Sequence, residues 1–481
     1  MWEYYDKKTV FLTGGTGFLG TAVLLRLLSD AKCKRIYLLL RGGQSRGRQK
    51  WGESLPTATV GWLLQHHRLT VLNGDISEPD FALTHDQLNL LRDEVNIMIH
   101  AASSINLTQT LPKACKQIVQ PSEAVARFGL QCYNLSRFVY VSTAYANSHL
   151  HMLSSEEDVT VEERIYPLSN EASRPVSEEY KELQALGTTS EYAVNDFPWA
   201  YGYAKHLSER LIMAMFTEAE RYDQLLIVRP SIIGPAEYFP FTGYNVLTSS
   251  PITVVAAALA NVPAVELQFA STMHDPANHA TIDEVPVDVV VDRLLVHLAH
   301  GTTGCVHAVS GKVGRISMKE LYDAIVALRK LPWAPRVAWL YESWHYEGQH
   351  WISKLFKVFG TSFSFSEHRT VALRDSSPKE ALQGFVLFKT ADAGPYELYS
   401  RHRDVQECAF VISRRMNVLL RIAIFEPFSI LSASFQKDIC RKCGDRHLQL
   451  VSTRAVVHNH KLPIQKKYAS IGCELKDFFS I

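Results

Sequence analysis

Short apolar runs recur along the first half of the chain and predict the strands of a buried sheet. They lie within residues 10–12, 35–41, 69–77, 95–103, 136–147 and 223–235. Polar and apolar residues do not alternate at their centres, which is typical of strands covered on both faces in a parallel sheet. Segments with helical spacing, such as residues 21–28, separate most of these runs. This order predicts an α/β fold with a doubly wound, parallel, Rossmann-type sheet.

Three glycines, Gly14, Gly17 and Gly20, lie between the first predicted strand and the first predicted helix. A backbone without side chains can turn tightly there and approach a phosphate at the positively polarised helix N-terminus. Their spacing, with two residues between successive glycines, resembles that of the extended branch of the short-chain dehydrogenase/reductase superfamily. We therefore expect a dinucleotide cofactor, held by Gly14, Thr16, Gly17, Phe18, Leu19 and Gly20.

The residue at the end of the second strand bears on the choice of cofactor. Sites that prefer NAD usually place an acidic side chain about 20 residues beyond the glycines, on the ribose 2′-hydroxyl. This chain has Arg41 there, and a guanidinium suits the 2′-phosphate of NADPH, which a carboxylate would repel. The small residue Ala101 follows the fourth strand, where the backbone must pass close to the cofactor. The superfamily resemblance adds Asp75, at the end of the third strand, beside the adenine.

Tyr201 and Lys205 are four residues apart on a predicted helix, so their side chains lie on one face. Reduction of a carbonyl by hydride from a nicotinamide places negative charge on the carbonyl oxygen, and a hydroxyl must donate a proton to it. A tyrosine does this better when an ammonium stabilises its phenolate. Tyr201 is therefore the expected acid, and Lys205 is expected to tune it and to bind the ribose. For a third hydroxyl, at the end of the fifth strand, related reductases favour Thr143, and Ser142 stays an alternative.

A set of short motifs spread over about residues 5–325 is similar to the fatty acyl-CoA reductase family. The most informative are STAYAN at the end of the fifth strand, ERIYP after it, and PVD at residues 286–288. The resemblance implies NADPH-dependent reduction of a fatty acyl-CoA thioester, through an aldehyde, to a fatty alcohol. We expect residues 1–330 to form the reductase domain with its substrate contacts, and residues 331–481 a smaller, mostly helical domain that closes over the acyl chain.

One position departs from the family pattern. Where the family usually has an asparagine that supports a proton relay, on the helix after the fourth strand, this chain has Ile118. Two alternatives therefore stay open: a reductase of a carrier-bound thioester or another small carbonyl metabolite, and an NADPH-sensing protein without turnover. Residues 251–267 supply apolar material for an acyl tunnel. The aromatic-rich stretch 333–351 is ascribed first to packing of a helical tail, and lining of the same tunnel is its alternative role.

The segment between Thr143 and Tyr201 is long and acidic. Residues 151–196 hold eleven Asp or Glu side chains and three Lys or Arg side chains. Such a segment repels the phosphates of coenzyme A, so we expect it to form a solvated lobe or the edge of a lid.

The composition of the chain argues against several other classes of protein. A net charge of +1 gives no basis for nucleic-acid binding, and no apolar run of about 18 residues predicts a membrane-spanning helix. The eight cysteines are scattered, which favours a reducing intracellular compartment. The cytoplasm and peripheral contact with the endoplasmic reticulum or peroxisome membrane both stay open, as does the oligomeric state. Cys440 and Cys443 with His447 fit no zinc module, so no metal is expected.

Overall fold

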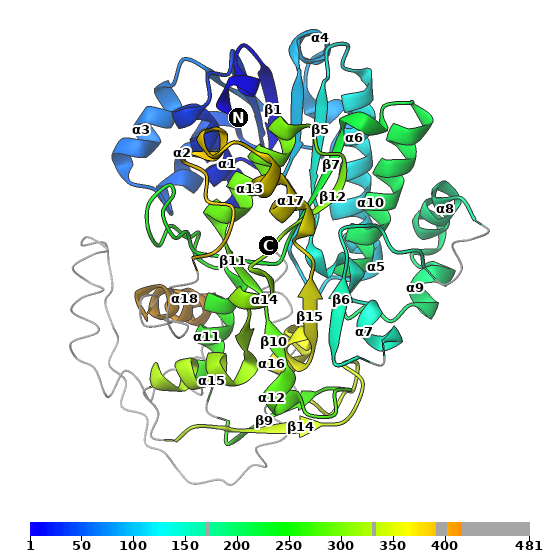
Figure 1. The fold of residues 1–481 in the computed structure, drawn as a ribbon, viewed down its shortest axis with the longest axis vertical. Coiled ribbons are helices and arrows are strands. Elements are labelled where there is room, and N and C mark those ends of the chain that lie inside the picture. The colour runs from blue at the N-terminus through cyan, green and yellow to red at the C-terminus, as the bar shows by residue number, and fades with distance from the viewer. Residues whose placement is uncertain (155, 169–173, 263, 330–332, 391–401, 416–481) are drawn as a thin grey trace, which may run out of the picture.

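The computed structural model describes residues 1–154, 156–168, 174–262, 264–329, 333–390 and 402–415. Its centre is a seven-stranded sheet with the order β12-β7-β5-β4-β1-β2-β3, in which every neighbouring pair is parallel (Figure 1). The strands are β1 (Thr9–Thr13), β2 (Arg35–Leu40), β3 (Leu69–Asn73), β4 (Ile97–His100), β5 (Arg137–Val141), β7 (Leu225–Pro230) and β12 (Gly304–Ala308). The strands predicted from the apolar runs are all present, so the parallel fold is confirmed. The prediction lacked β12, whose short run is interrupted by the buried polar residue His307.

Helices cover both faces of this sheet, each with its own apolar core. On one face, α1 (Phe18–Asp30) and α13 (Val287–His300) share a buried cluster with side chains of the strands. On the other face, α4 (His85–Glu94), α6 (Gln120–Gln131) and α10 (Ala200–Glu218) share a second cluster. This two-sided cover is what makes the sheet doubly wound, and it explains why its strands are apolar on both faces.

The chain changes direction at the centre of the sheet. β1 leads to β2 and β3 on one side, and β4, β5, β7 and β12 follow on the other. The ends of β1 and β4 lie side by side, with Thr13 opposite His100. The buried His100 ring bonds to Thr13 Oγ1 at 2.8 Å and to Ser122 Oγ on α6 at 3.2 Å, and burial lowers its pKa to about 3. The neutral His100 side chain thus links β4 to β1 and to α6, at the position where parallel sheets of this kind form a ligand-binding crevice.

The acidic segment before α10 is fastened to the reductase fold. It forms η4 (Ala144–Asn147), α7 (Leu150–Leu153), β6 (Asp158–Val161), α8 (Val176–Leu186) and α9 (Ser190–Val194). Glu179 on α8 is buried, and both of its carboxylate oxygens accept hydrogen bonds from Arg210 on α10 at 2.7 Å. Most residues of α8 are exposed, as the expectation of a solvated lobe requires, but Glu179 is an exception. A buried carboxylate is stable only with a well-placed partner, and Arg210 supplies it.

Most of the other elements lie below the seven-stranded sheet in Figure 1. The elements not yet named are η1 (Trp2–Tyr5), α2 (Gly43–Gly52), α3 (Thr57–Gln65), η2 (Pro79–Ala82), α5 (Leu111–Ala114), η3 (Cys115–Val119), η6 (Tyr222–Gln224), β8 (Ile232–Gly234), α11 (Pro251–Asn261), β9 (Glu266–Ala270), α12 (Pro276–His279), β10 (Thr281–Ile282), β11 (Glu284–Pro286), α14 (Gly311–Gly314), β13 (Ile316–Ser317), α15 (Met318–Ala327), β14 (Arg336–Leu340), α16 (Trp351–Leu355), η7 (Lys357–Gly360), β15 (Ser362–Phe365), α17 (His368–Ser376), η8 (Lys379–Leu382) and α18 (His402–Arg415).

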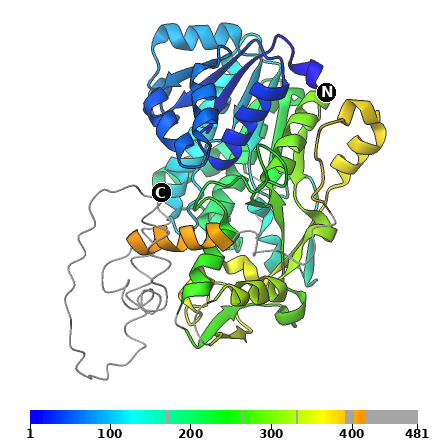
Figure 2. The ribbon, with the colours of Figure 1, turned by 90° about the vertical axis from the view of Figure 1, so that its left-hand side faces the viewer.

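Strands from beyond residue 331 pair with earlier parts of the chain. β14 lies parallel to β9, and β15 lies parallel to β6. Helix α18 packs against α11 in a further apolar cluster (Figure 2). Among the described residues after 331, more are helical than extended. The domain boundary at residue 330 stays a prediction.

Within the described ranges, no helix combines the length and the apolar character needed to cross a bilayer. The same residues contain no group of three or more His, Cys, Asp or Glu side chains that could hold a metal ion. Cys440, Cys443 and His447 lie outside the described residues.

Candidate active site

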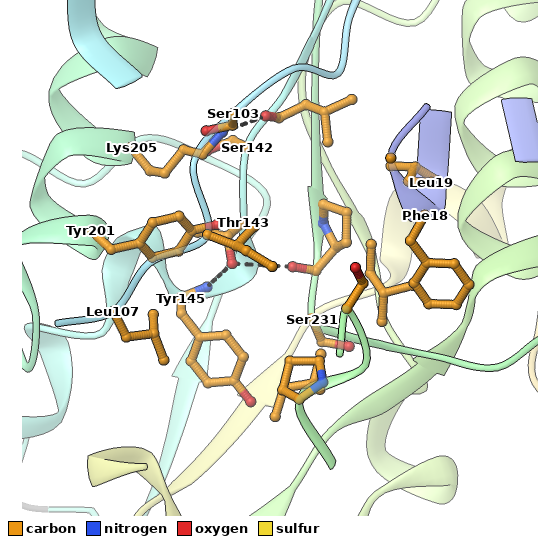
Figure 3. A pocket seen from close by; sticks show the side chains of 18 of the residues that line it. Phe18, Leu19, Ser103, Leu107, Ser142, Thr143, Tyr145, Tyr201, Lys205 and Ser231 are labelled. Carbon is orange, nitrogen blue, oxygen red and sulfur yellow. Dashed lines mark hydrogen bonds between the residues drawn. The ribbon is translucent and has the colours of Figure 1, made fainter. Parts of the chain in front are cut away.

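A cavity of about 390 Å³ lies at the carboxyl ends of the central strands (Figure 3). The glycine turn, the tail of β4, the end of β5 and the start of α10 all contribute to its wall. The residues predicted from the sequence that line it are Gly14, Gly17, Phe18, Leu19, Gly20, Ala101, Thr143, Tyr201 and Lys205. Ser142, the alternative third hydroxyl, lines it too, whereas Thr16, Arg41 and Asp75 do not. The cavity lies where parallel α/β sheets bind their ligands.

The glycine turn is shaped by close approaches of backbone to backbone. A Cβ atom on Gly20 would lie 2.1 Å from the carbonyl oxygen of Gly14. Gly14 has a φ of +80°, and a Cβ atom on it would lie 2.6 Å from the amide nitrogen of Ala102. Gly17 is the N-cap of α1 and has no capping side-chain hydrogen bond, so the first amide groups of the helix are free to bind a phosphate. These features fit the predicted dinucleotide site.

Arg41 and Asp75, the two residues predicted to contact the adenosine half, lie next to each other. Arg41 Nε is 3.7 Å from Asp75 Oδ2, and the Arg41 side chain is 79% exposed. Asp75 Oδ1 also accepts a hydrogen bond from the amide of Ser77 at 2.9 Å. A phosphate bound by Arg41 would therefore compete with this carboxylate.

The sequence analysis missed Trp51 on α2, whose indole N–H donates to the Gly15 carbonyl at 2.9 Å and so fixes the basic loop against the glycine turn.

Tyr201 and Lys205 approach the cavity from the first turns of α10. Lys205 is buried, its Nζ donates to the Val141 carbonyl at 2.8 Å, and it lies 4.9 Å from the centre of the Tyr140 ring. Figure 3 shows the Tyr201 ring next to Thr143, and Lys205 next to Ser142 and Ser103. The helical spacing of Tyr201 and Lys205 thus brings both to the cavity, as predicted, but Tyr201 hydrogen-bonds to Thr143 whereas Lys205 bonds to the Val141 carbonyl.

Burial shifts the pKa of both residues away from the ordinary value. It raises the pKa of Tyr201 to about 12, and a hydrogen bond with Thr143 acts in the opposite direction. Burial lowers the pKa of Lys205 to about 7, which the nearby carboxylate of Glu209 opposes. Thr143, rather than Lys205, is therefore the neighbour that favours the Tyr201 phenolate. Lys205 itself can gain or lose a proton near neutral pH, and a bound phosphate would favour its charged form.

The two candidate hydroxyls differ in the partners that they already have. Thr143 Oγ1 donates to the Pro230 carbonyl at 3.3 Å and accepts from the amide of Tyr145 at 3.3 Å. Ser142 Oγ is buried and has no partner among the described residues. A buried hydroxyl without a partner is costly unless a water or a ligand satisfies it. We therefore expect Ser142 to bind the cofactor, and Thr143 to act on Tyr201.

Ile118 does not line the cavity. It lies in the π-helical turn η3, between α5 and α6, and is buried in an apolar cluster with Phe197, Tyr203 and Leu207. The departure from the family pattern therefore lies in the apolar cluster behind α10, against which Tyr201 also packs. Its effect on a proton relay stays a prediction.

Several lining residues were not predicted to be part of the site. From the apolar run 251–267 only Pro251 lines the cavity, and the aromatic-rich stretch 333–351 contributes nothing to it. Aromatic and apolar side chains come from elsewhere, namely Tyr145, Trp199, Phe356, Val358 and Phe359. The STAY motif pointed to Tyr145, but nothing in the local sequence marked the others.

Comparison with known proteins identifies the family. The family model described as male sterility protein, an NAD-binding domain, matches residues 12–294. Fatty acyl-CoA reductase 1 of Rattus norvegicus is 28% identical over 301 residues, which cover 61% of this chain and 55% of the relative. The Drosophila melanogaster protein named fatty acyl-CoA reductase wat is 25% identical over 366 residues, 72% of this chain and 67% of the relative. The chain thus spans about half the length of the mammalian relative.

Solved structures support the fold. The terminal R domain from the myxalamid biosynthetic pathway has a TM-score of 0.52 at 17% identity and covers 82% of this chain and 91% of its own. The aureusimine biosynthetic cluster reductase domain has a TM-score of 0.53 at 14% identity, with coverages of 85% and 93%. At such identities these structures show the fold alone. With a family model that matches more than half of its length, the chain belongs to the male sterility protein family of NAD-binding oxidoreductases, the fatty acyl-CoA reductase family that its motifs indicate.

Proposed function

We propose that the protein reduces medium-to-long fatty acyl-CoA thioesters to fatty alcohols with NADPH, through an aldehyde. The observation that carries this proposal is that Thr143, Tyr201 and Lys205 line one cavity together with the glycine turn and a set of apolar side chains. The residues present fit a nicotinamide dinucleotide. The glycine turn leaves no room for a Cβ atom at Gly14 or Gly20, and the buried Ser142 hydroxyl is free for a ribose.

Bound NADPH would supply a hydride to the thioester carbonyl carbon. Tyr201 donates its proton to the carbonyl oxygen as negative charge develops there. The long hydrogen bond from Thr143 to the Pro230 carbonyl is readily exchanged, so the Thr143 hydroxyl can turn to the phenolate that forms. Lys205 holds the ribose, and the apolar residues exclude water. When the resulting hemithioacetal collapses, its hydroxyl proton passes to the leaving thiolate of coenzyme A. The aldehyde occupies the same site, and its reduction needs a second NADPH in place of the NADP⁺.

A screen of NADPH oxidation with acyl-CoA thioesters of different lengths, together with identification of the products, tests the proposal. We expect free coenzyme A and a fatty alcohol. Accumulation of aldehyde with NADPH in excess would limit the enzyme to the first reduction. Activity on carrier-bound acyl groups but on no acyl-CoA would show that the substrate is a carrier-bound thioester. NADPH binding without oxidation in any assay would contradict the proposal that the protein is an enzyme.

The choice of NADPH over NADH rests on Arg41 in this proposal. A charge-assisted hydrogen bond to the 2′-phosphate is worth roughly 1.5–3 kcal/mol, and solvent around the exposed Arg41 side chain reduces this contribution. Arg41→Ala is therefore expected to weaken NADPH binding about tenfold while leaving the Kd for NADH nearly unchanged. Titration of both cofactors by fluorescence measures this.

A neighbouring arginine supplies the control for that measurement. Arg46 is exposed on α2 and bonds to Gln49 at 3.0 Å, so Arg46→Ala removes the same charge from the basic loop. It should change neither Kd by more than about twofold, because exposed charges interact weakly. Equal losses for NADPH and NADH in Arg41→Ala would refute the assignment of Arg41 to the phosphate.

A further inference from the structure

One part of the cavity wall comes from a segment outside the residues that the family model matches. Phe356, Val358 and Phe359 line the cavity and are 6%, 7% and 1% exposed. They belong to η7 and the residue before it, whereas the family match ends at residue 294. In Figure 1 this segment follows α16, in the lower half of the molecule, while the sheet that carries the glycine turn lies in the upper half. Two different parts of the fold therefore enclose the cavity.

The segment is firmly anchored. The Phe359 amide donates to the Phe356 carbonyl at 2.9 Å, and the rings of the two residues stack with centroids 5.4 Å apart. Ser271 Oγ donates to the Gly360 carbonyl at 2.7 Å. A Cβ atom on Gly360 would lie 2.5 Å from the Ala270 carbonyl oxygen, so η7 is packed tightly against the end of β9. Such packing makes the segment a wall of defined position.

The three wall residues have hydrocarbon side chains, as have Ile232 and Pro251, which also line the cavity. The polar lining groups that act in the proposed chemistry either follow directly after β5, as Ser142 and Thr143 do, or belong to α10. A hydrocarbon chain that extends from a carbonyl group at Tyr201 is compatible with the apolar part alone. The volume of about 390 Å³ is near the lower end of the range for small-molecule sites, and the nicotinamide end of the cofactor must share it.

We propose that Phe356, Val358 and Phe359 form the end wall of the acyl site and limit the substrate to acyl chains of medium length. This inference rests on the proposed function, which it makes more specific. Because the wall is anchored to β9, the limit is sharp. Each added methylene raises kcat/KM about fourfold until the site is full, and the next carbons lower it.

The test compares kcat/KM for saturated acyl-CoA thioesters from octanoyl-CoA to stearoyl-CoA in the wild type and in Phe359→Ala. The variant removes a phenyl ring from the wall, and this ring occupies the space of roughly two to four methylene groups. The acyl length with the highest kcat/KM should therefore increase by roughly two to four carbons. Phe269→Ala is the matched control. Phe269 is equally buried in the same apolar cluster but does not line the cavity, so its loss should lower Tm and leave the optimum unchanged.

A second variant changes the wall in the opposite direction and serves if Phe359→Ala does not fold. Val358→Phe should fill part of the site and move the optimum to shorter chains, while the Kd for NADPH stays normal. If the wild type and the wall variants all reduce acyl-CoA with the same optimum of acyl length, the end-wall proposal is wrong, whereas the proposed function still holds. No reduction of any acyl-CoA by the wild type, with NADPH bound, would overturn both.

Discussion

Replacing Tyr201 with phenylalanine is expected to lower kcat by roughly 10²–10⁴-fold, the usual contribution of a general acid. The substitution keeps the ring that packs at the start of α10 and removes only the hydroxyl next to Thr143. The fold and the Kd for NADPH should therefore stay close to those of the wild type. Single-turnover measurement of NADPH oxidation with an acyl-CoA substrate gives the rate of the chemical step directly.

Tyr203 offers a matched control two residues further along the same helix. Its hydroxyl is buried and donates to Glu179, the carboxylate that also pairs with Arg210. Tyr203→Phe should thus lower Tm, because a buried hydrogen bond to a charged group is lost, while kcat stays near normal. A normal kcat in Tyr201→Phe combined with an inactive but folded Tyr203→Phe would transfer the role of acid to Tyr203.

Replacing Thr143 with alanine is expected to lower kcat roughly 10- to 100-fold, the effect of losing one hydrogen bond to a charged group. The hydrogen bond with Thr143 lowers the pKa of Tyr201, against the effect of burial. Without it the phenol is a weaker acid, and because Tyr201 acts in its protonated form, the falling limb of the pH–rate profile should move to higher pH. Thr143→Ser keeps the hydroxyl and should restore most of the rate, which a purely structural role of the side chain would not explain.

Ser142 should respond differently from its neighbour. Its hydroxyl has no partner among the described residues and lies beside Lys205 (Figure 3). Ser142→Ala is expected to raise the Kd for NADPH roughly 2- to 10-fold, the value of one hydrogen bond, with little change of kcat at saturating cofactor. If Ser142→Ala lost kcat while Thr143→Ala did not, the two assignments would be exchanged.

The elements that the sequence predicted well depend on residues that are close together in the chain. Gly20 has to be glycine because its Cβ atom would strike the Gly14 carbonyl, only six residues earlier. Tyr201 and Lys205 reach the same cavity because four residues make about one helical turn. The apolar runs of the parallel strands are buried on both faces, so each run could be recognised without knowledge of its neighbours in the sheet.

What the sequence could not predict are contacts between distant segments. Asp75 and Arg41 were each expected beside the cofactor, and only the fold shows that the two strand ends bring them within 3.7 Å of each other. The acidic composition of residues 151–196 indicated solvation, whereas Arg210 binds Glu179 in the interior. Composition describes the average residue of a segment and cannot identify the one carboxylate that has a buried partner.

The sequence by itself thus determined the doubly wound sheet, the glycine turn and the Tyr201–Lys205 pair, since local periodicity and spacing encode them. Only the tertiary structure decided which hydroxyl hydrogen-bonds to Tyr201, because Ser142 and Thr143 are adjacent in the chain and the local sequence favours neither of them. It also decided that Phe356 and Phe359 line the cavity and that the aromatic-rich stretch 333–351 does not. Both stretches are rich in aromatic residues and both contact β9, so no pattern within either stretch records which of them reaches the cavity.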